Sequence, residues 1–487
     1  MLNHTFHKVL YAAVMTWAVA MGGGCGVYEL HRAQDFARRD DLHDTAKESA
    51  VELPTHHGRL SLSDAVAMAI QYSPVLRSAR EDVRRAEGIR WQAWSRSLPK
   101  MGLQASYTQL EDIQKFEFMG QSFSMGEREN YSAAVALQHT LFASGSNLAA
   151  LRGSRAYQEA TEAIVEATRQ MVIAETRKAY YDVLLARELV EVSEQALGLA
   201  RSHLDDIEKR FREGVASEFD RLRAKVEVAN VEAEAIRARN LLRLARAQLA
   251  NSMGVSQNSD FELSDALSYE PVPVDLDAAQ ERALERRPDL RAVALQVEVE
   301  RQRLVMARAD ALPRVELTAL DSYSKPGWSS SFGGVLGGGG DGSSWERNRT
   351  LTVALQVPIF DAFSTHGKVF EQEAALRKAQ LQLLERTEAA LLEVQQAVLT
   401  IQDTEKFVES QRANVEQAEE ALRLADVGYK AGVNRLIEVQ DARTALTAAR
   451  QNYWRAVHAH MSAVLALEAA TGSVTASHAH DSGEQEK

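Results

Sequence analysis

Val135-Ala-Leu-Gln-His-Thr-Leu-Phe142 returns later in the chain, little changed, as Val353-Ala-Leu-Gln-Val-Pro-Ile-Phe360. The two stretches start 218 residues apart (353 − 135), and Arg212-Glu-Gly214-Val and Lys430-Ala-Gly432-Val are separated by the same distance. Matches of this length at one constant offset indicate that the same unit is present twice. The fold is therefore expected to be built from two similar halves.

A second set of matches lies nearer the start of each half. Pro74 and Pro288, each followed by x-Leu-Arg, are 214 residues apart (288 − 74), and the Leu-Pro pairs that end at Pro99 and Pro313 keep this offset. The offset changes to 218 across the Gly- and Ser-rich segment Lys325–Ser344, so the second half carries a short insertion there. We expect this segment to be a surface loop, because loops tolerate insertions better than regular elements do.

Each half is predicted to contain a first helix, two strands, a very long helix and a last helix. The first helix stops at the Leu-Pro pair because proline cannot continue a helix, and a Gly-Val turn precedes the last helix. In the first half the predicted helices are about Asp64–Ser97, Ser146–Arg212 and Glu218–Ser252. In the second half they are about Asp277–Ala311, Thr365–Tyr429 and Arg435–Thr471.

The long helices set the class of fold. Their apolar residues, such as Tyr181, Leu184 and Leu185, recur at helical spacing with few breakers. A helix of roughly 65 residues would extend about 100 Å, which no compact globular domain needs. Such a pattern is typical of a coiled coil or a helical barrel. A fibrous coiled-coil scaffold would satisfy the helices alone.

The predicted strands alternate apolar and small polar residues. Leu103, Ala105 and Tyr107 alternate with polar neighbours, and Val353 and Leu355 alternate with small or polar ones. One apolar face and one small polar face fit the wall of a membrane barrel around a wet lumen. The same alternation also fits an ordinary half-buried sheet. Four strands are too few to close a barrel of useful bore, and open edges in lipid leave backbone groups unpaired, so a membrane barrel would need several chains.

Composition and motifs exclude several classes of function. The formal net charge of −12 argues against a dedicated nucleic-acid binder. No zinc-protease, nucleophile-elbow or phosphate-loop motif is present, so we predict no catalytic residues and no cofactor. His458 and His460 are two positions apart on a predicted helix and thus on different faces, so no metal site is predicted.

The N-terminus has the pattern of a secretory signal. After Lys8 the apolar run Val9–Met21 leads to three glycines and Cys25, the only cysteine, and the run is too short to span a bilayer as a helix. Cys25 follows the run as a lipidation site of bacterial lipoproteins does, although Gly22 stands where a leucine is usual. A chance cysteine beside a discarded signal remains the other interpretation.

The duplicated order, the Leu-Pro pairs, Val357-Pro-Ile-Phe-Asp361 and Gly428-Tyr-Lys-Ala-Gly432 together resemble the TolC family of bacterial outer-membrane efflux proteins. The first half departs from the pattern, because Thr140 replaces the proline. The resemblance covers about Leu60 to Gly472. It divides the chain into a signal peptide, 1–25; an extension, 26–59; a first repeat, 60–255; a linker, 256–276; a second repeat, 277–472; and a tail, 473–487.

The resemblance implies a mainly α-helical fold with a small β part. It implies a homotrimer that combines an α-helical tunnel in the periplasm with a shared transmembrane β-barrel, four strands per chain, in outer-membrane lipid. The channel would be a passive exit duct and not an enzyme. Its partners would be a periplasmic adaptor protein and an inner-membrane efflux pump or ABC exporter. The insertion segment would then be an extracellular loop.

The resemblance also implies where the duct closes. In the family, acidic side chains of the second hairpin constrict the periplasmic end, and the matching residues are Glu438 and Asp441. They are one helical turn apart on one face, so several copies would form two acidic rings. The other interpretation is a pair of solvated surface carboxylates.

Other tip residues follow from the same comparison. Tyr429 matches a family tyrosine that helps to hold the tip closed, although ordinary packing near a turn would also explain it. Gly214 and Gly432 are expected to end the long helices, since glycine supplies the positive φ required there. Asp220 and Arg223 take the places of Glu438 and Asp441 in the first half, and could form inter-helix pairs at the closed tip.

Overall fold

The computed structural model of the protein describes residues 54–111, 114–118, 121–125, 129–325 and 345–474. The chain divides into two compact units. Pro54–His57 and Asn258–Asp260 are the described part of the first, in which the His56 N–H donates to Ser259 Oγ at 3.2 Å. The second unit, Gly58–Gln257 and Phe261–Lys487, contains the described helices. The predicted signal peptide, the insertion segment 326–344 and most of the tail lie outside the described residues.

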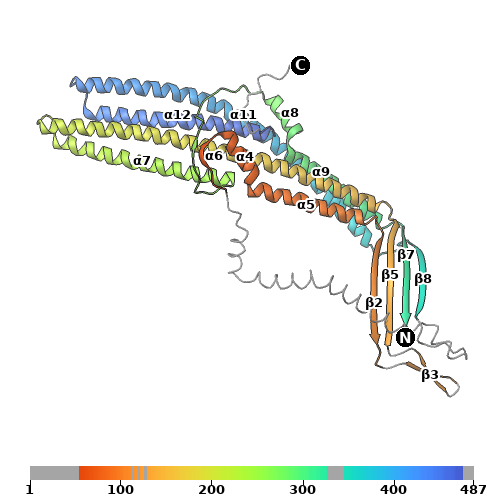
Figure 1. The fold of residues 1–487 in the computed structure, drawn as a ribbon. Coiled ribbons are helices and arrows are strands. Elements are labelled where there is room, and N and C mark those ends of the chain that lie inside the picture. The colour runs from red at the N-terminus through yellow and green to blue at the C-terminus, as the bar shows by residue number, and fades with distance from the viewer. Residues whose placement is uncertain (1–53, 112–113, 119–120, 126–128, 326–344, 475–487) are drawn as a thin grey trace, which may run out of the picture. The chain divides into compact units, whose positions relative to one another are not determined.

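The second unit contains the predicted order of elements twice (Figure 1). The first copy consists of α4 (Leu62–Tyr72), α5 (Pro74–Ser95), β2 (Lys100–Gln109), β5 (Glu129–Phe142), α6 (Ser146–Arg212) and α7 (Glu218–Met253). The second copy consists of α8 (Leu276–Arg286), α9 (Pro288–Ala309), β7 (Arg314–Lys325), β8 (Glu346–Gln356), α11 (Ser364–Lys430) and α12 (Leu436–Ala470). The predicted mainly helical fold with a small β part is thereby confirmed.

Four short strands were not predicted. A short hairpin of β3 (Gln114–Phe118) and β4 (Gln121–Met125) lies between β2 and β5 in the sequence. Two four-residue strands, β1 (His57–Leu60) and β6 (Asp260–Leu263), precede the first helix and follow the last helix of the first copy. None of the helices among the described residues is long and apolar enough to cross a membrane.

The first helix of each half is broken, and the prediction of one continuous helix was wrong. The breaks fall at Ser73 and Arg287, where ψ is 120° and 116°, and the next residue is a proline that opens a new helix. Proline disfavours a helical conformation in the residue before it, yet its fixed φ suits the first position of a helix. The repeated proline therefore bends both copies at the same place.

A glycine at the end of each copy packs against this break. Gly254 and Gly472 have φ of 70° and 68°. A Cβ at Gly254 would lie 2.7 Å from the Tyr72 carbonyl oxygen, and one at Gly472 would lie 3.0 Å from that of Arg286. Only glycine combines this positive φ with so close an approach. The matched prolines and glycines therefore form one contact that each copy repeats.

Strands from the two copies share one antiparallel sheet in the order β2-β5-β7-β8. The copies meet where β5 pairs with β7, with Val135 opposite Asp321. In register, the apolar residues Leu103, Val135 and Leu351 lie on one face, and Leu103 and Leu351 are 65% and 72% exposed. The predicted strands are thus confirmed, and their apolar face is uncovered within one chain.

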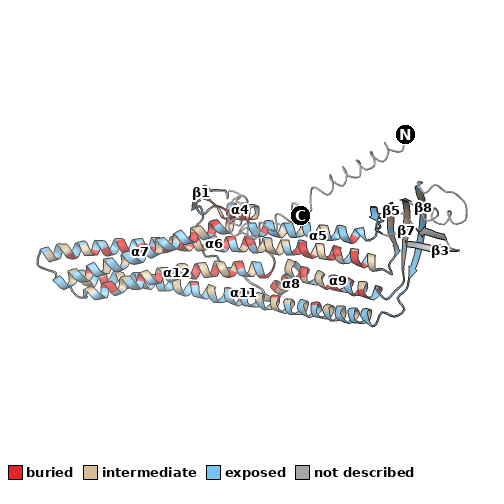
Figure 2. Ribbon diagram, turned by 90° about the horizontal axis from the view of Figure 1, so that it is seen from below, coloured by how far each residue is buried: buried red, intermediate tan, exposed pale blue. Residues whose placement is uncertain are grey.

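The long helices form a layer in the order α7-α6-α12-α11. Helix α6 packs on α7 and α12, and α11 packs on α12. The main apolar core lies between α4, α6, α7 and α12 and includes Tyr180, Leu184, Leu249 and Val457. Figure 2 shows buried residues along much of α6, whereas α11 is mostly exposed. Helices α7 and α11 form the two ends of this layer; among the described elements α7 also packs on α4, and α11 also packs on α9 and α8.

Candidate functional site

The two helical hairpins end in the same turn. Gly214 and Gly432 follow α6 and α11 and both have φ of 75°. The N–H of the residue after each glycine donates to a carbonyl five positions earlier, at 2.8 Å in the first hairpin and 2.9 Å in the second. This bond and the left-handed glycine are the Schellman ending of a helix. The turns bring the starts of α7 and α12, which carry the predicted gate residues, to the hairpin tips.

Glu438 and Asp441 lie on the exposed side of α12, close to its start. Both are exposed, whereas the intervening Val439 and Gln440 are buried at 1% and 6% exposure. The three-residue spacing places the two carboxylates on one helix face, away from the packed interior of the chain. Because α12 begins at Leu436, Glu438 is also in the first turn, where the helix dipole favours negative charge.

The matching first-half residues are used differently. Asp220 is part of a capping box at the start of α7: its N–H donates to Ser217 Oγ at 3.1 Å, and its carboxylate accepts from the Ser217 N–H at 3.3 Å. The α12 start has Arg435 at the cap and no side-chain cap. Within the described part of the chain Arg223 forms no ion pair. Its predicted pairing with another helix therefore stays a prediction, for which a second chain would have to supply the partner.

Tyr429 joins the tips of the two hairpins. The Arg210 guanidinium carbon lies 5.3 Å from the centre of the Tyr429 ring. A guanidinium over an aromatic face is attracted by the ring's charge distribution, and the two residues belong to α6 and α11. Tyr429 therefore makes a contact between hairpins and not only a contact beside its own turn.

A cavity of about 540 Å³ between the hairpins was not predicted. It is lined mainly by α6, α7 and α12, with His203, Gln440 and Arg443 among its residues. His203 is 8% exposed, and its Nε2, like Gln440 Nε2, is buried without a hydrogen-bond partner in the described structure. Burial and the positive charge of Arg443 lower the pKa of His203. No sequence pattern indicates this site, since α12 lies far from α6 and α7 along the chain.

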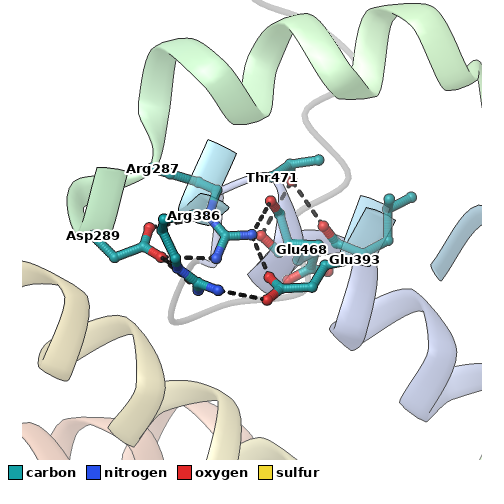
Figure 3. A network of polar contacts seen from close by, with 8 residues as sticks. Arg287, Asp289, Arg386, Glu393, Glu468 and Thr471 are labelled. Carbon is teal, nitrogen blue, oxygen red and sulfur yellow. Dashed lines mark hydrogen bonds and ion pairs between the residues drawn. The ribbon is translucent and has the colours of Figure 1, made fainter. Parts of the chain in front are cut away.

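A polar network fixes the second copy where α8 meets α9 (Figure 3). Arg287 contacts Asp289 at 2.8 Å and Glu393 at 2.5 Å, and Arg386 contacts the same two carboxylates at 2.7 and 2.9 Å. Burial acts to raise the pKa of Asp289, but hydrogen bonds from Arg287 and Arg386 outweigh it and lower the pKa to about 2. Two cations thus alternate with two anions, and each charge has two partners.

A second buried pair joins the two copies to each other. Arg177 of α6 is fully buried and binds Glu468 of α12, with Nη2 to Oε1 at 3.3 Å; the same nitrogen contacts the Tyr181 hydroxyl at 3.3 Å. An arginine at apolar spacing between Ile173 and Tyr180 was the signal in the sequence. These contacts hold charges at fixed places between helices.

The described site contains helical hairpins with turns and exposed acids at one end of the helices, and a four-stranded sheet with an uncovered apolar face. Very long helices and a sheet with an uncovered apolar face thus belong to the same chain. Cys25 lies outside the described residues.

Comparison with known proteins gives the family. The profile of the family described as "Outer membrane efflux protein" matches residues 65–255 and 279–473, and the chain belongs to this family. It is accordingly an outer-membrane efflux protein with a periplasmic helical part, and not an enzyme, as the resemblance predicted.

Individual relatives agree. CyaE of Bordetella pertussis is 27% identical over 475 residues, which cover 94% of this chain and 93% of CyaE. TolC of Escherichia coli is 23% identical over 405 residues, which cover 82% of this chain and 80% of TolC. The crystal structure of the outer membrane protein VceC from Vibrio cholerae has the same fold, with a TM-score of 0.71 at 23% identity over 84% of this chain and 96% of VceC.

Proposed function

We propose that three copies of this chain form a passive exit duct of a tripartite efflux or secretion system. The observation that carries the proposal is the pair of open ends of the helix layer. Helices α6 and α11 are each 67 residues long, but α6 buries 23 side chains and α11 buries eight. The exposed apolar residues of α11 include Leu381, Leu384, Leu392 and Leu399.

The other end of the layer has the same property. On α7, Leu222, Val226, Ile236 and Leu244 are 51–63% exposed. Contiguous apolar surface of this kind marks an interaction site. If α7 of one copy packs on α11 of the next, both faces are covered and the layer closes into a tunnel. A repeated head-to-tail contact gives a closed ring when its rotation closes.

The sheet supports the same assembly. Among the described strands, its outer strands β2 and β8 each pair on one side only. Unpaired backbone groups in hydrocarbon cost several kcal/mol each, so β2 of one copy is expected to pair with β8 of the next. Three copies would share one barrel, with residues such as Leu103 and Leu351 facing lipid. A coiled-coil scaffold without channel activity would give this apolar sheet face no role.

The narrow end would be formed by Glu438 and Asp441. Both carboxylates are exposed on the face of α12 opposite its buried side, as side chains that line a pore must be. Three copies would place six carboxylates in two rings, which favour cations and repel anions. Tyr429, Asp220 and Arg223 would adjust how the tip opens, and the turns at Gly214 and Gly432 would fix its shape.

The duct would carry out no chemistry. Family relationships support a periplasmic adaptor as the partner at the hairpin tips and an inner-membrane pump or ABC exporter as the source of energy. A cleaved signal peptide, 1–25, would direct the chain through the inner membrane, and Cys25 would be a lipid anchor if it is retained. The repeats 60–255 and 277–472 would each supply one hairpin and two barrel strands.

The gate is tested in planar bilayers with the double variant Glu438→Ala/Asp441→Ala. We expect weaker cation selectivity and less block by multivalent cations, with little change in stability, because exposed acids contribute little to it. Glu385→Ala/Glu388→Ala is the matched control, since it removes two exposed acids three positions apart on α11, far from the tip. Unchanged selectivity in the first variant would mean that the constriction lies elsewhere.

The oligomer is tested by the mass of the detergent-extracted particle. A stable trimer is expected. Leu384→Glu, which puts a charge on the exposed apolar face of α11, should reduce the trimer fraction strongly. A monodisperse monomer of the unaltered protein with its strands intact would refute the assembly.

A further inference from the structure

Charged residues interrupt the apolar face of the four-stranded sheet at the end away from the helices. Asp321 on β7 accepts a hydrogen bond from Arg347 Nε at 2.9 Å, and Arg349 Nε lies 3.6 Å from the same carboxylate. Arg347 uses a second nitrogen on the other oxygen of Asp321. One carboxylate therefore faces two guanidinium groups, and the Arg349 side chain is 66% exposed.

These charges lie on the apolar face, not on the small polar one. Side chains alternate along a strand, so Arg347 and Arg349 share a face of β8 with Leu351 and Leu355. Arg349 is seven positions from Gln356 at the helix end of β8, about 23 Å along the strand. The apolar band of a membrane barrel is about 25 Å tall. Because barrel strands tilt by about 40°, this length spans about 18 Å of the band's height, and Arg349 lies in the outer part of the band.

Aromatic residues accompany the charges. Tyr323 is paired with Arg347 across the strands, and the Arg347 guanidinium lies 5.1 Å from the centre of its ring. Tyr107 and Tyr131, also paired, have ring centres 5.0 Å apart on the same face. Tyrosines gather where a membrane protein meets the headgroup region. These tyrosines therefore mark the same outer border of the apolar band that Arg349 indicates.

An apolar groove runs from this border towards the helices. Its volume is about 350 Å³, and Val135, Leu137, Ala319 and Leu351 line it together with Asp321 and Arg349. By register, Val135, Asp321 and Arg349 form one row, and Leu137, Ala319 and Leu351 form the row nearer the helices. The groove therefore has an apolar floor and a cation at its outer end.

We propose that this groove binds a phosphorylated glycolipid of the extracellular leaflet, with an acyl chain along Leu137 and Leu351 and a phosphate on Arg349. The inference rests on the proposed placement of the sheet in the outer membrane. Arginine matches phosphate with two parallel hydrogen bonds, and the second guanidinium gives the cluster a net positive charge. In the first repeat the offsets of 214 and 218 place Tyr107 and Tyr131, which are also paired, at the positions of Asp321 and Arg349, so the matching pair carries no charge.

The test uses the whole trimer in phosphatidylcholine nanodiscs with added diphosphorylated lipid A, and native mass spectrometry counts the lipid A that is retained. The unaltered protein should retain lipid A, and Arg349→Gln should weaken retention about tenfold. Asp321→Asn removes the competing carboxylate and should strengthen retention. The control is Arg314→Gln, since Arg314 lies at the helix end of β7 and contacts Gln356.

Two further arms identify the ligand. Dephosphorylated lipid A should be retained no better than phosphatidylcholine, and inorganic phosphate should not displace the lipid, because it cannot occupy the apolar groove. Equal retention of both lipid A forms, or unchanged retention by Arg349→Gln and Asp321→Asn, would overturn the proposal. A particle that does not enter nanodiscs as a trimer would instead contradict the proposed function.

Discussion

The two copies of the repeat have the same backbone plan and different side-chain chemistry. Both bend at a proline, end at a glycine and turn at a Schellman motif. Yet α6 buries 23 side chains and α11 only eight, and α7 starts with a capping box where α12 starts with Arg435. The prolines and glycines that set the direction of the chain are present in both halves. The first half therefore buries more of its long helix, and the second half leaves more of its long helix exposed.

The largest effect is expected from disrupting the contact that both repeats share, in which a glycine packs against the helix break. Gly254→Val puts a branched side chain at φ 70°, with its Cβ 2.7 Å from the Tyr72 carbonyl oxygen. We expect a loss of more than about 3 kcal/mol in the free energy of unfolding, seen as little or no folded protein. Gly472→Val, with contacts near 3.0 Å, should be damaging but less so.

The matched control is Gly198→Ala in α6, where a Cβ meets nothing within 4 Å. It should be neutral or stabilising by up to about 1 kcal/mol, since alanine favours a helix over glycine. If Gly254→Val folds with unaltered stability, the contact between each glycine and its helix break has no structural importance.

The next effect concerns chemistry that only the second copy has. Arg287→Met leaves Asp289 and Glu393 with Arg386 alone, and Arg287 has only 6% of its side chain exposed. Removing one partner of a buried ion pair costs about 3 kcal/mol, less here because Asp289 is partly exposed. Urea unfolding at pH 7 measures the loss. Arg282→Met, an exposed arginine on α8, should change it little.

The same network predicts a dependence on pH. The pKa of Asp289 falls from 3.8 to about 2 in the folded protein, so its contribution is complete above about pH 4 and is lost as the pH falls through 2. The expected decrease is about 2 kcal/mol. Arg287→Met should flatten this dependence. At the equivalent positions the first half has Ser73 and Val75. It should therefore contribute nothing to this pH dependence of the free energy of unfolding.

The elements that could be predicted from the sequence are those with local causes. The helices Ser146–Arg212 and Ser364–Lys430 follow from uninterrupted apolar spacing. The breaks at Ser73 and Arg287 were missed because proline at the first helical position is compatible with a helical pattern on both sides. The Ser217–Asp220 capping box was present in the sequence as a serine with an acid three positions later.

The sites were less accessible to prediction. Glu438 and Asp441 came from a family resemblance, since an exposed acid pair on a helix is in itself ordinary. His203 and its neighbour Arg443 are 240 positions apart (443 − 203). No pattern in one sequence brings two such residues together, because the packing of α6 on α12 does so.

A smaller effect is expected from changes at the starts of α7 and α12, which can be compared with each other. Ser217→Ala should destabilise the start of α7 by about 1 kcal/mol, measured as faster hydrogen exchange in its first turn. The converse change, Arg435→Ser, gives α12 the sequence of a capping box with Glu438. It should slow exchange there, and it should lower cation selectivity because the Glu438 carboxylate turns to its own helix end. Arg435→Ala is the control for the lost charge; equal selectivity in the two variants would contradict this use of Glu438.

The smallest effect is expected at His203, which lies between the two repeats of one chain. Burial and Arg443, with a further contribution from Arg210, lower its pKa, and Asp206 and Asp426 oppose them. Glu227 of α7 faces Arg443 as a further charge. A histidine with a lowered pKa is neutral in the packed state. Its packing is therefore fully stable above about pH 6.5 and weakens as the pH falls below that value, because an opened state then takes up the proton.

Spin labels at Val215→Cys and Val433→Cys, on a Cys25→Ser background, would report the distance between the exposed hairpin turns. We expect a wider distribution at pH 5.5 than at pH 7.5, and His203→Gln should remove the difference. His366→Gln, an exposed histidine at the other end of α11, should retain it. A pH response that persists unchanged in His203→Gln would place its origin in other groups.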